Sequence, residues 1–430
     1  MKYQIPKGTF DILPTEAKEQ NKWKESSRWH YLEETMRQLA LDYGFREIRT
    51  PIFEQTDLFI RGVGETSDIV SKEMYTFKDK GDRSMSLRPE GTASVIRSFV
   101  ENGLQQFGSN QKFFYIGPFF RYDRPQAGRY RQFHQFGVEA IGQGSPEQDL
   151  EVIDMLFELY RRLGLKNLKV MLNSLGGLGT RQIYKEKLLD FLRPHFTSLS
   201  PESQIRFEKN PLRILDSKDP KEQALLKGAP TILDELDPDS RTHFEELCDL
   251  LKMQEIPFEI EPKLVRGLDY YNRTVFEITS DVLGAQNTIG AGGRYDGLSA
   301  LLGGPDLPSI GFSTGMERIL QTMDGQSAPF PPPPAPYICL IPLSDEAKTA
   351  CIQTLYALRH NKVAAELLTT KKIQKTLQTA SDLGAQFSII LGDDELEKGL
   401  VQVKNMTTRD STQIRWEELI SFLLNHRNNS

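Results

Sequence analysis

Two short segments that combine arginine, glycine and tyrosine are the parts of this sequence best suited to chemistry. They are residues 266–271 (RGLDYY) and residues 290–297 (GAGGRYDG). Both lie where strand-like runs border turns, and each gathers cations, hydroxyl groups and glycine backbone within a few residues. This combination predicts a pocket that holds a small polar molecule next to a phosphate. Glycine-rich turns are common, so either segment taken alone is also compatible with a purely structural turn.

A second group of polar residues lies in two strand-like runs, 112–124 and 132–142, which flank a Pro/Gly-containing loop and predict a long hairpin. Side chains alternate between the two faces of a strand, so each run presents one polar face. These faces carry Phe119, Arg121 and Asp123 on the first run and Gln135, Gly137 and Glu139 on the second. Such a face is costly to bury unless it binds a ligand. The alternative is a solvated outer face, which the many aromatic residues of the hairpin disfavour.

Two further segments place charged residues near the start of a helix. Residues 88–92 (RPEGT) separate a strand-like run from a helical run, where Glu90 and Thr92 also fit ordinary helix-start chemistry. Residues 309–318 (SIGFSTGMER) indicate a buried strand that runs into a helix. Arg318 lies off the apolar stripe of that helix, so it either forms a surface ion pair or binds a phosphate, for which a guanidinium is well suited. The predicted stripe consists of Met316, Ile319, Leu320 and Met323.

The elements that position these residues divide the chain into three parts. Residues 327–336 contain four consecutive prolines and predict a semi-rigid linker, with a Pro-rich surface loop as the alternative. We therefore expect a core at 1–326 and a second domain at 337–430. Within the core, residues from about 177 to 257 are charged and helical in spacing, which predicts a helical insertion between two strands of the main sheet.

The pattern of strands and helices predicts an α+β protein. Before the linker, strand-like runs are separated by turns, which favours an antiparallel sheet with helices on one side. After the linker, strands and helices alternate, which favours a small α/β domain with a largely parallel sheet. A helical segment at 372–383 carries Lys372 and Lys375, with Lys371 beside it, on its polar side. These lysines are either a solvated helix face or a nucleic-acid contact.

Composition narrows the class of protein. At 430 residues, two or three domains are expected. The formal net charge of −6 argues mildly against nucleic-acid binding, so any RNA contact depends on local patches. The three cysteines form no CxxC pair, which makes a disulfide framework or a structural zinc improbable. The start of the chain lacks a signal-peptide pattern and no run reaches the length of a membrane span, so we expect a cytoplasmic protein.

Taken together, these motifs resemble those of histidyl-tRNA synthetases, a family of class II aminoacyl-tRNA synthetases. The hairpin resembles the second class II motif, residues 309–318 the third, and residues 45–52 (FREIRTPI), an edge strand ending in proline, the first. The resemblance extends to residues 210–216 (NPLRILD) and to the C-terminal domain, so it covers nearly the whole chain. It implies a six- or seven-stranded antiparallel catalytic sheet, a homodimer and a C-terminal anticodon-binding domain.

The resemblance also implies an activity, which is the ATP-dependent ligation of histidine to tRNA(His) through a histidyl-adenylate. Its cofactor requirements would be ATP as a substrate and Mg²⁺ carried with ATP, with no metal site made by protein side chains alone. Arg121 and Arg266 would contact the α-phosphate from opposite sides, and Arg318 the γ-phosphate. Asp123 stands where the family usually has Glu for the adenine amino group, and Arg129 would lie near the nucleotide or the tRNA acceptor end.

The histidine pocket implied by the resemblance is built from a second set of residues. Its members would be Glu90, Thr92, Gln135, Glu139, Tyr270 and Tyr271. Glu90 and Thr92, with Gln135 nearby, would bind the α-amino group. Glu139 would accept a hydrogen bond from one imidazole nitrogen and Tyr271 would donate one to the other.

Two other functions are open at this point. A non-catalytic regulatory paralogue from histidine biosynthesis would share the core but would lack the RGLDYY peptide and the C-terminal domain. A synthetase for glycine, proline or threonine would share the C-terminal domain type, but Glu139 and Tyr271 argue against it.

Overall fold

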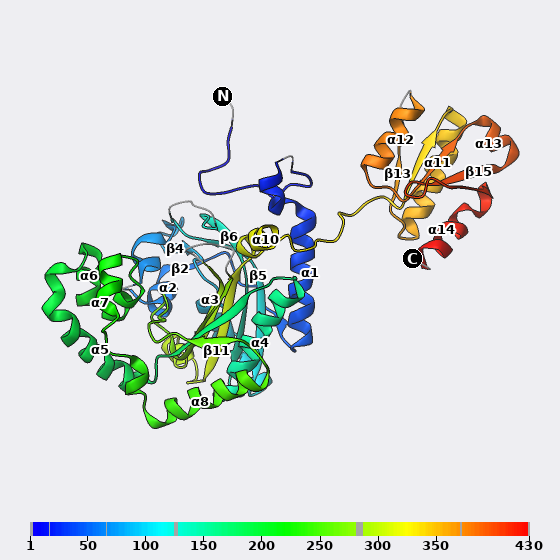
Figure 1. Cartoon of the computed structure of the whole chain (residues 1–430). Helices are drawn as coiled ribbons and strands as arrows, with labels where there is room; N and C mark the ends of the chain where they lie inside the picture. The colour runs from blue at the N-terminus through cyan, green and yellow to red at the C-terminus, as the bar shows by residue number, and fades with distance from the viewer. Residues whose placement is uncertain are drawn as a thin grey trace. The chain divides into compact units, whose positions relative to one another are not determined.

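The computed structural model describes residues 3–16, 18–65, 67–123, 128–280, 287–369 and 372–428. The chain divides into two compact units, Met1–Pro331 and Pro332–Ser430, and the division falls inside the proline-rich segment (Figure 1). No helix in the described part of the chain is both long and apolar enough to cross a bilayer.

The first unit is built on a sheet in which the described residues form eight strands. Its order is β1 (Arg46–Glu47), β5 (Gln111–Phe120), β6 (Gln132–Ile141), β11 (Ser309–Gly315), β10 (Thr288–Arg294), β9 (Asn272–Ser280), β7 (Leu168–Ser174) and β8 (Phe258–Ile260). The six inner strands are antiparallel throughout, while the short edge strands β1 and β8 pair in parallel with their neighbours. The antiparallel sheet is thus confirmed, and these two edge strands bring it to eight rather than six or seven.

Four long helices cover one face of this sheet and form the main hydrophobic core with it. They are α1 (Ser26–Asp42), α4 (Pro146–Arg162), α8 (Pro238–Met253) and α10 (Met316–Gly325). The predicted stripe of α10 lies fully in this core. On β6, Phe136, Val138 and Ala140 also point into it, so alternation turns Gln135 and Glu139 to the opposite face of the sheet.

The opposite face is only partly covered, by shorter elements. Helix α3 (Thr92–Glu101) packs on the aromatic residues of β5, and α2 (Thr56–Val63) and α9 (Leu298–Leu301) lie beside α3. A small sheet of β2 (Phe53–Gln55), β4 (Ser84–Leu87) and β3 (Thr76–Lys78) precedes α3 in the chain. Helices therefore lie on both faces, not on one as the sequence predicts, and they leave the polar side of β6 accessible.

Helices α5 (Leu178–Leu192), α6 (Pro201–Lys209) and α7 (Pro220–Leu226) follow β7 (Figure 1). They pack in a separate hydrophobic cluster that also includes Tyr271 and Val275 of the core. Ser-Pro and Asp-Pro pairs start α6, α7 and α8, with proline at the first helical position. The Ser200 hydroxyl accepts from Ser203 N at 3.2 Å, and Asp237 accepts from Ser240 N at 2.8 Å, so these helix starts are specified locally. Helix α8 packs against α4 in the main core, whereas α5–α7 do not contribute to that core.

The second unit contains a five-stranded sheet in its described residues, in the order β13-β12-β14-β15-β16. Its elements are β12 (Ile338–Pro342), α11 (Asp345–His360), β13 (Ala365–Leu367), α12 (Ile373–Asp382), β14 (Phe387–Leu391), α13 (Asp393–Lys398), β15 (Leu400–Asn405), β16 (Ser411–Arg415) and α14 (Leu419–Asn428). β12, β13 and β14 are parallel, but β15 and β16 are antiparallel. The prediction of a largely parallel sheet holds for the first three strands and fails for the last two. β15 is antiparallel to β14 although α13 lies between them in the chain, and β16 is antiparallel to β15, to which a short turn joins it.

Candidate ligand-binding site

The polar face of the main sheet forms the floor of a cavity of about 1430 Å³ in the first unit. Its walls come from the segment before α3, the end of the β5–β6 hairpin, the 266–271 loop, the start of α10 and the helical insertion. Ten of the eleven residues singled out from the sequence line it, although they come from distant parts of the chain. These are Glu90, Thr92, Arg121, Asp123, Arg129, Gln135, Arg266, Tyr270, Tyr271 and Arg318.

The eleventh residue, Glu139, lies behind the cavity wall and is 1% exposed. Its Oε1 accepts hydrogen bonds from the Thr92 hydroxyl at 2.8 Å and the Tyr115 hydroxyl at 3.3 Å, and its Oε2 accepts from the Tyr295 hydroxyl. Burial raises the pKa of Glu139 to about 8, against the opposing effect of these hydroxyl donors. The carboxyl group is therefore presented to the cavity through a layer of three hydroxyls.

Sequence analysis missed Tyr115 and Tyr295, which form this layer. Tyr115 is opposite Gly137 in the hairpin register. A Cβ at Gly137 would overlap the Tyr115 ring and hydroxyl, so glycine at this position lets the tyrosine lie across the sheet and reach Glu139. The sequence could have indicated Tyr115, because in the predicted hairpin this aromatic residue is opposite Gly137 on the polar face.

Glu90 and Thr92 do act at a helix start, because Glu90 accepts from Thr92 N at 2.8 Å and from Ala93 N at 2.9 Å. Burial raises the pKa of Glu90, and these backbone donors oppose the shift. Gln135 lies nearby, and its Oε1 is buried with no hydrogen-bond partner among the described residues. A buried carboxylate and an unpartnered amide oxygen together favour a ligand with several N–H donors.

Arg121 and Arg266 lie at the same cavity but are held differently. Arg121 Nε donates to Pro89 O at 2.8 Å, and its guanidinium lies 5.4 Å from the centre of the Phe133 ring. Arg266 pairs through Nη1 with Glu277 and lies 5.9 Å from the centre of the Tyr271 ring, while its buried Nε has no hydrogen-bond partner in the part of the chain that the structure describes. Burial lowers the pKa of Arg121 despite nearby carboxylates, so this cation gains from an anionic ligand.

Glu277 is another residue that sequence analysis missed. It lies on β9 between Phe276 and Ile278, which are buried in the main core, so alternation alone places it on the cavity face. Its Oε2 accepts from the Thr288 hydroxyl at 2.6 Å. Glu277 and Thr288 both line the same cavity as Arg266.

Apart from Arg121 and Arg266, the cavity has a further cationic part, which contains Arg318 and Arg129 together with Asp123. Arg318 Nη1 donates to Thr288 O at 2.6 Å, and Arg129 pairs with Asp123 at 3.1 Å. Burial, and then the neighbouring Arg129, lower the pKa of Arg318. Two adjacent cations of this kind are stabilised by a polyanion such as a triphosphate.

Arg294, in the glycine-rich segment 290–297, does not line the cavity. It is 0% exposed, pairs with Asp149 at 2.6 Å and donates to Ser145 O at 2.9 Å. The glycines of this segment serve strand packing, because a Cβ at Gly292 would overlap the carbonyl oxygen of Gly311 on β11. The expectation that this cation lies beside a phosphate is therefore wrong for Arg294, and only Tyr295 of this segment contributes a side chain to Glu139.

Comparisons with known proteins give one consistent result over the full chain. Residues 8–319 match the family model described as histidyl-tRNA synthetase, and residues 337–426 match the anticodon binding domain model. The histidine–tRNA ligase of Protochlamydia amoebophila (strain UWE25) is 54% identical over 426 residues, which cover 99% of this chain and 100% of that protein. The enzyme of the same name from Geobacillus sp. (strain WCH70) is 47% identical over 429 residues, which cover 98% and 99%. The crystal structure of apo S. aureus histidyl-tRNA synthetase is similar with a TM-score of 0.82 and 39% identity, covering 98% of this chain and 100% of that one.

Proposed function

The chain belongs to the histidyl-tRNA synthetase family, and from its cavity we propose that it ligates L-histidine to tRNA(His) at the expense of ATP. The reaction passes through a histidyl-adenylate and releases pyrophosphate and then AMP. The observation that carries this proposal is the convergence of Arg121, Arg266 and Arg318 on one cavity. Tyr270 and Tyr271 line the same cavity, and the Glu139 carboxyl group lies behind its wall.

The histidine end of the cavity is the side that holds Glu90, Gln135, Tyr270 and Tyr271. The α-ammonium is assigned to Glu90, Thr92 and the unpartnered Gln135 Oε1. The imidazole is assigned to Tyr271 and to Glu139 with its hydroxyl layer. A site that hydrogen-bonds both ring nitrogens discriminates by factors of about 10⁴ to 10⁵ against side chains that lack them, so no separate editing domain is required.

The ATP end is the cationic side. The histidine carboxylate attacks the α-phosphorus, the bond to the bridging oxygen breaks, and pyrophosphate leaves with the electron pair. Little proton transfer is needed, so the protein acts by positioning and by stabilising charge. Arg121 and Arg266 are assigned to the α-phosphate, Arg318 to the γ-phosphate, and Asp123 with Arg129 to the adenine side.

Mg²⁺ is expected to arrive with ATP, because Mg²⁺ is usually held by one or two carboxylates together with substrate phosphates. Among the described residues, no group of three His, Cys, Asp or Glu side chains is arranged to hold a metal by itself. The Glu277 carboxylate and the Thr288 hydroxyl are the oxygens in the cavity that fit such an ion. When bound, the ion neutralises phosphate charge.

The regulatory alternative has less support. The chain carries the RGLDYY loop with Arg266 in the cavity, and it also carries the C-terminal domain. Relatives named histidine–tRNA ligase match it from end to end.

The proposal also includes two binding partners, tRNA(His) and a second copy of the chain. tRNA(His) would bind through the C-terminal unit, and a second copy of the chain would pack near the first motif, where Ile52 is 45% and Phe53 is 51% exposed. A cytoplasmic location rests on family membership.

Aminoacylation of tRNA tests the proposed function. The full chain is mixed with radiolabelled histidine, Mg-ATP and tRNA(His) or a second tRNA as a control, and acid-precipitable histidine is measured. We expect label on tRNA(His) only. Binding of histidine without any charging would support the regulatory alternative instead.

A further inference from the structure

The NPLRILD segment, residues 210–216, is a sequence motif to which the proposed reaction assigns no role. It forms the 3-10 helix η5 (Pro211–Asp216), which follows α6 in the helical insertion. The side chains of Asn210 and Arg213 form hydrogen bonds with the 266–271 loop, which carries Arg266 and Tyr271.

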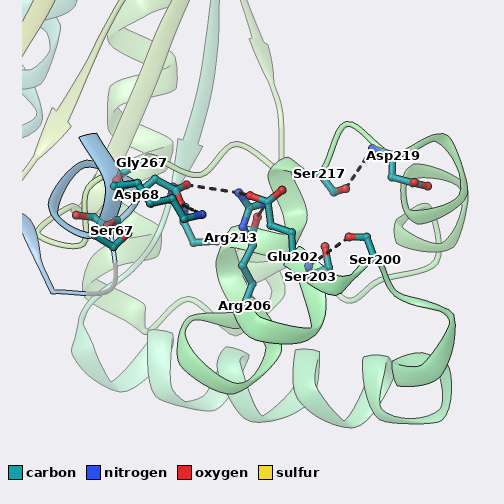
Figure 2. Close-up of polar contacts among 12 residues, drawn as sticks. Ser67, Asp68, Ser200, Glu202, Ser203, Arg206, Arg213, Ser217, Asp219 and Gly267 are labelled. Carbon is teal, nitrogen blue, oxygen red and sulfur yellow. Dashed lines mark hydrogen bonds and ion pairs between the residues drawn. The ribbon is translucent and has the colours of Figure 1, made fainter. Parts of the chain in front are cut away.

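Arg213 bridges two segments of the catalytic core with the two arms of its guanidinium (Figure 2). Nη1 donates to the carbonyl oxygen of Gly267 at 2.7 Å, and Nη2 pairs with Asp68 Oδ2 at 2.8 Å. The Arg213 side chain is 14% exposed and that of Asp68 is 32% exposed, so the ion pair is partly buried, whereas the bond to Gly267 lies at the surface. Gly267 directly follows Arg266, which means that Arg213 holds the backbone next to the catalytic cation.

Asn210 holds the same loop two residues further on. Its Nδ2 donates to Asp269 Oδ1 at 2.8 Å. On the other side of the loop, Asp269 N donates to Val63 O at 3.1 Å at the end of α2. The loop is thus clamped between α2 and the insertion.

Packing continues this attachment up to the tyrosines. The hydrophobic cluster of the insertion contains Tyr184, Leu188 and Leu215, and the same cluster includes Tyr271, with Leu268 and Tyr270 packed against it. Arg181 of α5 also donates to Tyr271 O at 3.0 Å. The loop therefore rests on the insertion through polar and apolar contacts.

Asp68 connects this attachment to the other wall of the cavity. It precedes the short helix η2 (Ile69–Glu73), and Glu73 O accepts from Tyr122 N, next to Arg121, at 2.7 Å. Burial alone would raise the pKa of Asp68, but Arg213 and then Lys72 and Arg206 lower it below its usual value. Asp68 is therefore held ionised, as an ion pair with Arg213 requires.

We propose that Arg213 and Asn210 are positioning residues for adenylation, because they fix the 266–271 loop and with it Arg266 and Tyr271. If so, the helical insertion contributes to the adenylation of histidine, a step that does not involve tRNA. This inference rests on the proposed function. The competing explanation is that the insertion acts only on RNA, in which case these contacts have no effect on adenylate formation.

ATP–pyrophosphate exchange separates the two explanations, since the assay contains no tRNA. Loss of placement of a reacting group by about 1 Å can cost on the order of 10²-fold in rate. For Arg213→Ala we expect kcat of histidine-dependent exchange to fall about 10- to 100-fold. The histidine KM should rise, because Tyr270 and Tyr271 move with the loop. The ATP KM should rise less, because only Arg266 of the three arginines assigned to ATP belongs to the loop.

Arg206→Ala is the matched control. Arg206 also belongs to the insertion and also approaches Asp68, at 3.5 Å, but its shortest contact is with Glu202 at 2.8 Å. It donates a long hydrogen bond, 3.4 Å, to the backbone oxygen of Arg213, and it makes no hydrogen bond to residues 266–271. We expect its exchange kinetics to stay within about threefold of those of the wild type. A similar loss in Arg206→Ala and Arg213→Ala would overturn the inference, because it would indicate general damage to the insertion.

Two milder variants keep the inference testable where Arg213→Ala does not fold. Arg213→Lys keeps a charge beside Asp68, but a single ammonium lacks the fork that reaches both partners, so it should lie between wild type and Arg213→Ala. Asn210→Ala removes only the bond to Asp269 and should also lower kcat. Wild-type exchange in these variants, with only tRNA charging impaired, would refute the positioning role. Absence of histidine-dependent exchange in the wild type would instead refute the proposed function itself.

Discussion

Single residues divide the cavity into an anion-binding side and a hydrogen-bonding side. Arg266 belongs to both, since its guanidinium lies between Glu277 and the ring of Tyr271. In the absence of a ligand, Glu277 neutralises it. The charge of Arg266 is therefore already held at the cavity, and we expect a bound phosphate to compete with the Glu277 carboxylate for the guanidinium.

The first prediction concerns Arg266. Removing a preorganised electrostatic contact to the transition state typically costs about 10²- to 10³-fold in rate. Arg266→Ala should therefore lower kcat for adenylate formation by roughly that factor and change histidine affinity much less. Exchange kinetics and equilibrium binding of histidine measure the two effects separately.

Tyr271→Phe provides the contrast for Arg266→Ala. It removes one hydroxyl and keeps the ring, so it should raise the histidine KM and leave the ATP KM unchanged. Exchange by Arg266→Ala within a few-fold of wild type would show that this arginine is not catalytic.

The second prediction concerns pH and Glu139. Its pKa is raised from the usual 4.5 to about 8 in the folded protein, so folding favours its protonated form. Between pH 4.5 and about pH 8 the folded state binds a proton at Glu139 that the unfolded state does not. As the pH rises through this range, Glu139 therefore lowers the free energy of unfolding by about 1.4 kcal/mol per pH unit. Above about pH 8 the contribution is constant.

Glu139→Gln should flatten this dependence, because the amide does not titrate. The measurement is denaturant unfolding of wild type and Glu139→Gln between pH 5 and pH 8, and the difference in slope isolates this residue from the others that titrate. Parallel curves for the two proteins would mean that Glu139 is ionised throughout the range.

At the scale of elements, the sheet and its hairpin explain most of the cavity. β5 and β6 are in register along their whole length, which stacks Phe119, Tyr115 and Phe113 opposite Phe133, Gly137 and Glu139. The hydroxyl layer over Glu139 depends on this register and on the absence of a side chain at Gly137.

The third prediction is a test of that arrangement. Gly137→Ala introduces a methyl group where the Tyr115 ring lies, so the ring must move and its hydrogen bond to Glu139 must break. We expect a higher histidine KM and a loss of stability of about 1–3 kcal/mol from overpacking. Kinetics and thermal unfolding of the variant check both. As a comparison, Gly303→Ala alters a glycine with open space around it, although its positive φ adds some strain.

Local rules are sufficient to predict some of these elements from the sequence. Alternation correctly places Gln135 and Glu139 on one face, and helical spacing correctly identifies the buried stripe of α10. Local rules fail for Arg294, because its partner Asp149 lies on α4, far away in the sequence. For Glu277 they give the face of the sheet but not the partners, because only the fold brings Arg266 and Thr288 to it. Of the three lysines considered for RNA contact, Lys372 and Lys375 are exposed, and Lys371 lies outside the described residues.

At the scale of the whole molecule, the residues assigned to adenylation and the C-terminal domain belong to different units of the chain. Every residue assigned to histidine or ATP lies in Met1–Pro331. The second unit has a hydrophobic cluster of its own, built around β12, β14 and α11. Each unit therefore has the core that independent folding requires.

The fourth prediction follows from this separation. A fragment that ends at Pro331 should fold, catalyse histidine-dependent pyrophosphate exchange and charge tRNA poorly. Ending it at Gln326 would be worse, because Phe330 packs on Tyr31 with ring centres 6.2 Å apart and lies under Arg28 at 4.3 Å. Unchanged charging efficiency and tRNA KM in the fragment would contradict an anticodon-binding role for the C-terminal unit.

The measurement that tests the account most directly is ATP–pyrophosphate exchange by the full chain with each of the twenty amino acids in turn. The cavity joins three arginines, which we propose bind the triphosphate, to the tyrosine and glutamate side chains that we propose bind both nitrogens of the imidazole. We therefore predict exchange that depends on histidine and exceeds the rate with any other amino acid by about 10⁴-fold or more. Exchange with glycine, proline or threonine but not with histidine would contradict the account.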